Sequence, residues 1–195
     1  GALEEVDDAV RAECGEGATL VVADLTQGEL VDKLGAALHE RFGRLDGLVV
    51  TAAEIGPLTP VSHLEPRQLE RSIAVNLLAA HRLIRSLDPL LRAAPDARAV
   101  FATDGNGRNR AYWGGYAASK AALEALVLSY AHELRLTPVG VNLFDPGPMS
   151  TRLRHRAYPG EDPASRPDPA VAAAALIELL LPGCARRAEL VVHRG

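Results

Sequence analysis

Short apolar runs alternate with longer segments of helical periodicity along this chain, and this alternation is what most restricts the possible folds. Each apolar run is brief, is partly β-branched and is followed by polar or Gly/Pro residues. We predict strands at 18–23, 45–50, 97–103, 140–144 and 189–193. Strands that alternate with helices favour a parallel sheet with helices on both faces.

The segments between these runs carry apolar residues every three to four positions, which is the period of an amphipathic helix. Gly15 and Gly43 are expected to end the first two helices, because glycine readily takes the left-handed conformation found at helix C-termini. We predict helices at 2–13, 28–42, 66–92, 115–135 and 168–181. A chain of 195 residues is expected to form a single domain over 1–195.

The composition of the chain argues against nucleic acid, metal ions and membranes as binding partners. A net charge of −4 gives no basic surface for nucleic acid. The two cysteines are far apart and the six histidines are isolated, so we expect neither a disulfide framework nor a metal site. The longest apolar run, 170–181, is too short to cross a bilayer, and no signal peptide is recognisable. We therefore expect a cytoplasmic protein with no nucleic-acid or membrane partner.

Tyr116 and Lys120 form a candidate chemical pair. If the segment is helical, the two side chains lie on one face, one turn apart. A neighbouring ammonium favours the phenolate and lowers the pKa of a tyrosine from its ordinary value of about 10. Such a tyrosine can exchange a proton with a substrate oxygen. The alternative is an ordinary surface tyrosine and lysine, because Tyr-x-x-x-Lys alone is a weak pattern.

Polar or turn-forming residues follow several of the predicted strands. They are Asp24, Thr51, Thr103 and Pro146-Gly147. Ligands of parallel sheets bind beyond the carboxyl ends of the strands. We expect these residues to gather along one edge of the sheet, although they are remote in sequence.

With these motifs in this order, the chain resembles the short-chain dehydrogenase/reductase family. The stretch Arg-Ala-Tyr-Trp-Gly-Gly at 110–115, before Tyr116, is similar to a group of bacterial oxidoreductases with Arg-Ala-Asn-Trp-Gly-Ala at this place. The similarity covers essentially the whole chain and continues through 145–147 and 158–163. It implies an α/β, Rossmann-like, doubly wound parallel sheet. It also implies a cofactor, NAD or NADP, and hydride transfer between nicotinamide and a carbonyl or secondary alcohol of a small-molecule substrate.

The resemblance implies catalytic roles for matching residues. Tyr116 resembles the acid/base, and Lys120 resembles the residue that lowers its pKa and holds the nicotinamide ribose. Asn76 resembles the helix asparagine that anchors a water in the proton relay; the alternative is a mid-helix kink, because Asn is a poor helix-interior residue. Asp24 resembles the acidic residue that contacts adenine; the alternative is a cap of the following helix.

The implied cofactor contacts lie after the strands and along the catalytic helix. They are Asp24, Leu25, Thr51, Ala52, Ala53, Tyr116, Lys120, Pro146, Gly147 and Thr151.

The chain departs from the family pattern at one group of these cofactor contacts and at the position of the catalytic serine. Thr51-Ala52-Ala53 stands where the family has Asn-Ala-Gly, and Ala53 adds a methyl group where backbone approaches the cofactor. The family's catalytic serine is replaced: one alignment places Thr103 there and another places Asp104. Thr103 could donate a hydrogen bond to a substrate carbonyl. A carboxylate only accepts, and it would repel a developing oxyanion.

The family's first strand and Gly-rich phosphate turn should precede residue 1, so we expect a partial, N-terminally truncated domain. The Gly-rich stretch 104–107 lies before the wrong helix to replace that turn. Either the chain is a fragment of a longer enzyme, or the strand at 18–23 moves to pair directly with 45–50. Two functions stay open: an NAD(P)-dependent oxidoreductase, or a non-catalytic binding or scaffolding member.

The long helices at 66–92 and 115–135 carry apolar residues on more than one face. In this family they usually form a subunit interface, so we expect a homodimer or homotetramer, with core burial as the competing interpretation. The expected contributors on the second helix are Ala121, Ala122, Leu126 and Leu128. The segment 149–168 resembles the family's substrate lid and is longer than an ordinary connection.

Overall fold

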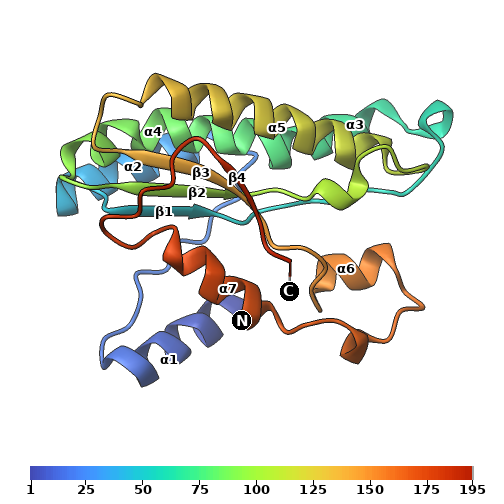
Figure 1. The fold of residues 1–195 in the computed structure, drawn as a ribbon, viewed down its shortest axis with the longest axis horizontal. Coiled ribbons are helices and arrows are strands. Elements are labelled where there is room, and N and C mark those ends of the chain that lie inside the picture. Colours follow the sequence, from blue (N-terminus) through green and yellow to red (C-terminus); the bar gives the residue numbers. More distant parts are fainter. Residues whose placement is uncertain (195) are drawn as a thin grey trace.

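A four-stranded parallel sheet with helices on both faces forms the centre of the molecule (Figure 1). The structure is a computed structural model that describes residues 1–194, apart from the side chains of Ala2 and Asn106. The strands are β1 (Gly47–Val50), β2 (Arg98–Ala102), β3 (Gly140–Asp145) and β4 (Leu190–Val192), and they pair in this order. The predicted parallel α/β fold is confirmed, and each of the four strands coincides with a predicted run, although β3 continues to Asp145.

Three helices pack on one face of the sheet: α2 (Gly28–Phe42), α4 (Ala79–Ala93) and α5 (Gly114–Glu133). Helix α7 (Pro169–Glu178) covers the other face. The predicted helix at 66–92 is real but is interrupted: α3 (Pro66–Ile73) joins α4 through a π-helical turn, Ala74–Leu78. The predicted endings are confirmed, because Gly15 and Gly43 have φ values of 77° and 71° directly after α1 (Ala2–Cys14) and α2.

The two faces of the sheet bury alternate side chains of the same strands, as the period of two requires. On β2, Phe101 packs toward α4 and α5, whereas Val100 packs toward α7. On β3, Leu143 and Phe144 divide in the same way. Apolar residues of both central strands therefore pack on both faces of the sheet, which fixes these strands in the middle of the molecule.

The predicted strand at 18–23 is wrong. This segment has no regular secondary structure and pairs with no described strand, and Leu20, Val21 and Val22 are 36%, 52% and 89% exposed. The proposed direct pairing with 45–50 is also absent, because β1 pairs only with β2 and forms an edge of the described sheet. Apolar, β-branched composition makes a segment fit for a strand, but a strand forms only where a neighbouring backbone supplies hydrogen bonds.

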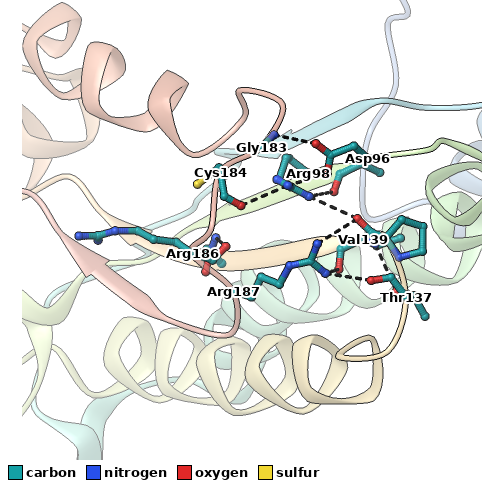
Figure 2. Close-up of polar contacts among 11 residues, drawn as sticks. Asp96, Arg98, Thr137, Val139, Gly183, Cys184, Arg186 and Arg187 are labelled. Atoms are coloured by element: carbon teal, nitrogen blue, oxygen red, sulfur yellow. Dashed lines mark hydrogen bonds and ion pairs between the residues drawn. The ribbon is translucent and has the colours of Figure 1, made fainter.

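Two arginines tie the end of the chain to the amino-terminal ends of the strands, opposite to the site described below (Figure 2). Arg98 is only 2% exposed, pairs with Asp96 at 2.5 Å and donates to the carbonyl of Cys184 at 3.1 Å. Arg187 donates to the carbonyls of Thr137 and Val139 at 2.9 and 3.3 Å. These contacts hold the segment between α7 and β4 beside β3, so that β4 can extend the sheet.

Over residues 1–194, no helix combines the length and apolar character that crossing a membrane would need.

Candidate active site

A cavity of about 440 Å³ opens at the carboxyl ends of β1, β2 and β3. Its polar lining comes from segments that are remote in sequence and meet because parallel strands end at one edge. The lining includes Thr51, Ala53, Thr103, Asp104, Trp113, Tyr116, Lys120, Pro146, Gly147, Met149, Thr151, Leu153, Arg154, Tyr158 and Leu176. The predicted gathering of strand-end residues is confirmed for Thr51, Thr103 and Pro146-Gly147.

Helix α5 presents Tyr116, Lys120 and Glu124 on one face, because the three are spaced four residues apart. Tyr116 and Lys120 are each only 3% exposed, so the alternative of an ordinary surface pair is excluded. The Trp113 ring meets the Tyr116 ring edge-on, with 5.8 Å between centroids. Gly107 lies against both rings: a Cβ there would come within 3.1 Å of the tryptophan and 3.3 Å of the tyrosine. The absence of a side chain at Gly107 therefore lets the Gly-rich loop pack closely against both rings.

The Tyr116 hydroxyl donates a hydrogen bond to Asp104 Oδ2 at 3.3 Å. Burial raises the pKa of Tyr116 far above its ordinary value of 10, and the negative charge of Asp104 raises it further. The predicted lowering of this pKa is therefore wrong. The lysine lies 5.9 Å from the ring centroid, and its effect does not outweigh burial and the facing carboxylate.

Lys120 donates from Nζ to the carbonyl oxygen of Ala102 at 3.0 Å. Burial lowers the pKa of its ammonium from 10.5 to about 8, although the charges of Asp104 and Asp145 act in the opposite direction. A lysine has three N–H donors, and the bond to Ala102 uses one of them.

The structure distinguishes between Thr103 and Asp104, the two candidates for the position of the family's catalytic serine. Asp104 is the residue that faces the Tyr116 hydroxyl. The Thr103 hydroxyl instead donates to Glu124 Oε1 at 2.6 Å, so it is not presented to a substrate carbonyl. Glu124, which is 9% exposed, also pairs with Arg108 of the loop after β2. Our sequence prediction missed Glu124, although its spacing from Tyr116 and Lys120 was a usable signal.

Asn76 lies in the π-helical turn and is 2% exposed. Its Oδ1 accepts from the backbone N–H of Glu54 at 2.7 Å, and its Nδ2 donates to the Glu54 carbonyl at 2.8 Å. Nδ2 also donates to Ser119 Oγ at 2.8 Å, and that hydroxyl donates to the Tyr116 carbonyl. The side chain thus joins the segment after β1 to α5, while its wider helical turn fits the predicted irregularity.

Three predicted cofactor contacts lie outside the cavity lining: Asp24, Leu25 and Ala52. The Asp24 carboxylate accepts from the backbone N–H and hydroxyl of Thr26 at 2.9 and 2.8 Å, a local turn before α2. Gln27, and not Asp24, is the N-cap of α2, so the predicted cap is one turn misplaced. Leu25 packs against the main core.

Asp145 organises the loops around the cavity. It is 7% exposed, accepts from the Gly105 N–H at 2.9 Å and accepts from the Gly147 N–H at 3.0 Å. Gly147 has a φ of 68° and lies close to the carbonyl of His193, which favours glycine there. One carboxylate therefore fixes the loops that follow both central strands.

The predicted lid is a folded segment that covers part of the cavity. Thr151 accepts from the Arg154 N–H and so caps α6 (Arg152–Ala157), as an N-cap residue does. Glu161 then accepts from Arg154 at 2.6 and 2.7 Å and from Arg166 at 2.9 and 2.6 Å. The Arg154 guanidinium also lies 3.9 Å from the Tyr158 ring centroid. Glu161 therefore links α6 to the later part of the same lid segment through its two arginine partners.

Comparisons of sequence decide the family. The model of the family described as short chain dehydrogenase matches residues 1–162. The chain belongs to the short-chain dehydrogenase family. This family comprises NAD(P)-binding oxidoreductases with a Rossmann-like fold, as the sequence resemblance implied.

Similar proteins place this short-chain dehydrogenase near bacterial oxidoreductases. It is 33% identical over 173 residues to the oxidoreductase YciK of Escherichia coli K12, which covers 86% of this chain and 68% of that protein. It is 30% identical over 161 residues to YbbO of the same strain, covering 80% of this chain and 59% of that protein. A short chain dehydrogenase from E. coli CFT073, solved in complex with NADPH, superposes with a TM-score of 0.93 at 28% identity. That superposition covers 99% of this chain and 82% of the other.

Proposed function

We propose that this short-chain dehydrogenase is an NAD(P)-dependent oxidoreductase that interconverts a carbonyl compound and a secondary alcohol, with Tyr116 as the acid/base. The observation that carries the proposal is the convergence of Tyr116 and Lys120 on one buried cavity at the carboxyl ends of the strands. Burying an ionisable hydroxyl and an ammonium together costs free energy, and such groups in a cavity are typical of a functional site.

The cavity residues fit the nicotinamide end of the cofactor. Lys120 holds an ammonium in a buried place with N–H donors beyond the one used by Ala102, which suits a ribose hydroxyl. Thr51, Ala53 and the loop from Pro146 to Thr151 would surround the ring. The described residues include no Gly-rich turn for the pyrophosphate. Bound nicotinamide would supply the hydride. Two similar solved structures, which hold NADPH and NADP, support NADP(H) as the cofactor.

The chain's own residues would transfer the proton and exclude water from the site. Tyr116 would give its hydroxyl proton to the substrate oxygen during reduction and take it back during oxidation. Lys120 would stabilise the resulting phenolate through its charge. Trp113 and Tyr158, whose centroids are 5.8 Å apart, would keep water from the reacting oxygen.

The second candidate is a non-catalytic binding or scaffolding member, and one observation favours it. Asp104 faces Tyr116 and raises its pKa, which opposes the phenolate that catalysis requires.

Titration with NADH and NADPH separates the two functions without a substrate. We expect enhanced nicotinamide fluorescence and a raised melting temperature for wild-type protein. Lys120→Ala should weaken both signals, whereas Lys33→Ala, an exposed lysine on α2, should not. If millimolar NADH and NADPH change neither signal, the oxidoreductase proposal fails for this chain and the binding or scaffolding function is favoured.

A further inference from the structure

The cavity of the candidate active site is lined by members of two apolar clusters that pack separately. In one cluster, Leu153 and Tyr158 of the lid pack with Trp113. The other cluster contributes Ala172 and Leu176 of α7. Leu153, Tyr158 and Leu176 are only half-buried, so part of their apolar surface faces the cavity. Covering such surface with an apolar ligand lowers the free energy, because water is released from it.

The groups that could meet a reacting carbonyl come from other elements of the cavity. Tyr116 and Lys120 lie on the catalytic helix α5, and Thr51 follows β1. The lid and α7 face the cavity largely with apolar side chains, among them Leu153 and Leu176. A site of this composition binds a ligand through its apolar body and orients it through a few polar groups.

A charged group on the ligand would find no ready partner at the apolar walls. Arg154, which lines the cavity from the lid, is engaged by Glu161 at 2.6 and 2.7 Å. Its guanidinium also lies 3.9 Å from the ring centroid of Tyr158. Lys120, the other cation of the described lining, lies one helical turn after Tyr116 at the polar end. Placing an unpaired charge against apolar side chains is costly, so the lid and α7 favour a neutral ligand.

We infer that the substrate is a neutral ketone or secondary alcohol with a phenyl-sized or larger apolar group beside the reacting carbon. Its oxygen would meet Tyr116, and its apolar group would contact Leu153 and Tyr158 of the lid and Leu176 of α7. This position leaves the part of the cavity near Ala53 to the nicotinamide. The inference rests on the proposed oxidoreductase function and names its substrate class.

Three methyl ketones that differ only at the far end of one ring test the apolar walls by binding alone. Calorimetry of the wild-type chain would compare acetophenone with 4-methylacetophenone and with 4-acetylbenzoate. We expect the added methyl group to tighten binding about threefold, because its burial removes apolar surface from water. The carboxylate should weaken binding about tenfold or more, because its charge would meet apolar side chains.

Trp113 shows whether the ketones occupy this cavity, because it is the single tryptophan of the chain and lies in the cavity wall. We expect 4-methylacetophenone to change its emission and to saturate at the concentration that calorimetry gives. Leu153→Ser removes apolar surface from the wall and should weaken binding of this ketone about fivefold. Leu136→Ser, at a fully exposed leucine, is the matched control and should bind as the wild type does.

Equal affinities for 4-methylacetophenone and 4-acetylbenzoate, no saturable change of the Trp113 emission, or unchanged binding in Leu153→Ser would each overturn the inference. The wild-type affinities and emission decide the matter even if Leu153→Ser does not fold. A parallel NADPH titration keeps the two proposals apart. Binding of NADPH without ketone selectivity would overturn the substrate class alone, whereas ketone selectivity without NADPH binding would count against the oxidoreductase and not against the apolar site.

Discussion

The hydroxyl of Tyr116 donates to the carboxylate of Asp104, so the proposed proton donor of this site is held by an acceptor-only group. Burial is the first cause of the raised pKa of Tyr116, and Asp104 is the second. Because Lys120 does not reverse this effect, the proton chemistry of Tyr116 depends on residue 104 as well as on the lysine.

Replacing the facing carboxylate should therefore lower the pKa of Tyr116. In Asp104→Ser we expect a fall of about one unit or more, since the repulsion by a nearby negative charge is removed. The Cζ chemical shift of carbon-labelled tyrosine would follow ionisation up to the highest pH at which circular dichroism shows an intact fold. Tyr116 should therefore begin to ionise at a lower pH in the variant than in the wild type. Asp88→Asn is the matched control, because Asp88 accepts from Tyr130 and should affect only that residue. An unchanged Tyr116 signal in Asp104→Ser would contradict the assigned cause.

The buried ammonium of Lys120 should make folding stability rise with pH. Its pKa is about 8 in the folded chain and 10.5 ordinarily, so the unfolded chain binds this proton more tightly. The penalty is complete below pH 8 and disappears as the pH rises toward 10.5. Relative to Lys120→Met, the wild type should gain about 3 kcal/mol of unfolding free energy over that window. Urea unfolding at several pH values measures the difference. Lys33→Met should follow the wild type, and parallel profiles for wild type and Lys120→Met would show that the ammonium carries no such penalty.

Asn76 should be a larger source of stability than an ordinary helix-interior residue. Asn76→Ala leaves the backbone groups of Glu54 and the Ser119 hydroxyl without their partner, and we expect a loss of about 2–4 kcal/mol. Ser119→Ala removes one of these contacts and should cost about 1 kcal/mol. Chemical denaturation of the two single variants and the double variant would give their coupling. Additive losses would show that the Asn76–Ser119 bond contributes nothing.

The ion pairs of Glu161 should keep the lid folded over the cavity. Hydrogen bonds from Arg154 and Arg166 lower the pKa of Glu161 to about 2. The ion pairs of Glu161 therefore persist at neutral pH and weaken only as the pH falls toward that value. In Glu161→Gln, amide exchange across 152–166 should become several-fold faster, because two arginines lose their charged partner. Glu189→Gln, which breaks only an exposed pair with Arg186, serves as the control. Unchanged exchange in Glu161→Gln would mean that other contacts hold the lid.

We propose that the helical segment 66–92, which comprises α3 and α4, and helix α5 form a subunit interface in a homodimer or homotetramer. Ala121 is exposed and Ala122 and Leu126 are half-buried, whereas Leu128 packs against the core and so follows the competing interpretation. Light scattering should give at least a dimeric mass for the wild type. Ala121→Arg should lower it, because a charged side chain cannot be buried unpaired. Ala174→Arg, at an exposed position of α7, should not. A monomeric wild type would reject the proposal.

Several features of the site were predictable because they depend on local periodicity. The four-residue spacing placed Tyr116 and Lys120 on one helix face, and the same spacing would have included Glu124. The alternation of strands and helices placed Thr51, Thr103 and Pro146 at one sheet edge. Asp24 was misjudged because its carboxylate has a nearer partner in Thr26, a local competition that a motif does not reveal.

The sequence by itself determined the parallel α/β fold, the helix endings at Gly15 and Gly43, and the pairing of Tyr116 with Lys120, because each follows from short-range spacing. Only the tertiary structure decided that residues 18–23 form no strand, since a strand needs a neighbour's backbone. It also decided that Asp104 and not Thr103 faces the tyrosine, and that burial and this carboxylate raise the tyrosine's pKa where the lysine alone was expected to lower it. A pKa depends on every charge and on the depth of burial around a group, and neither is fixed until the chain has folded.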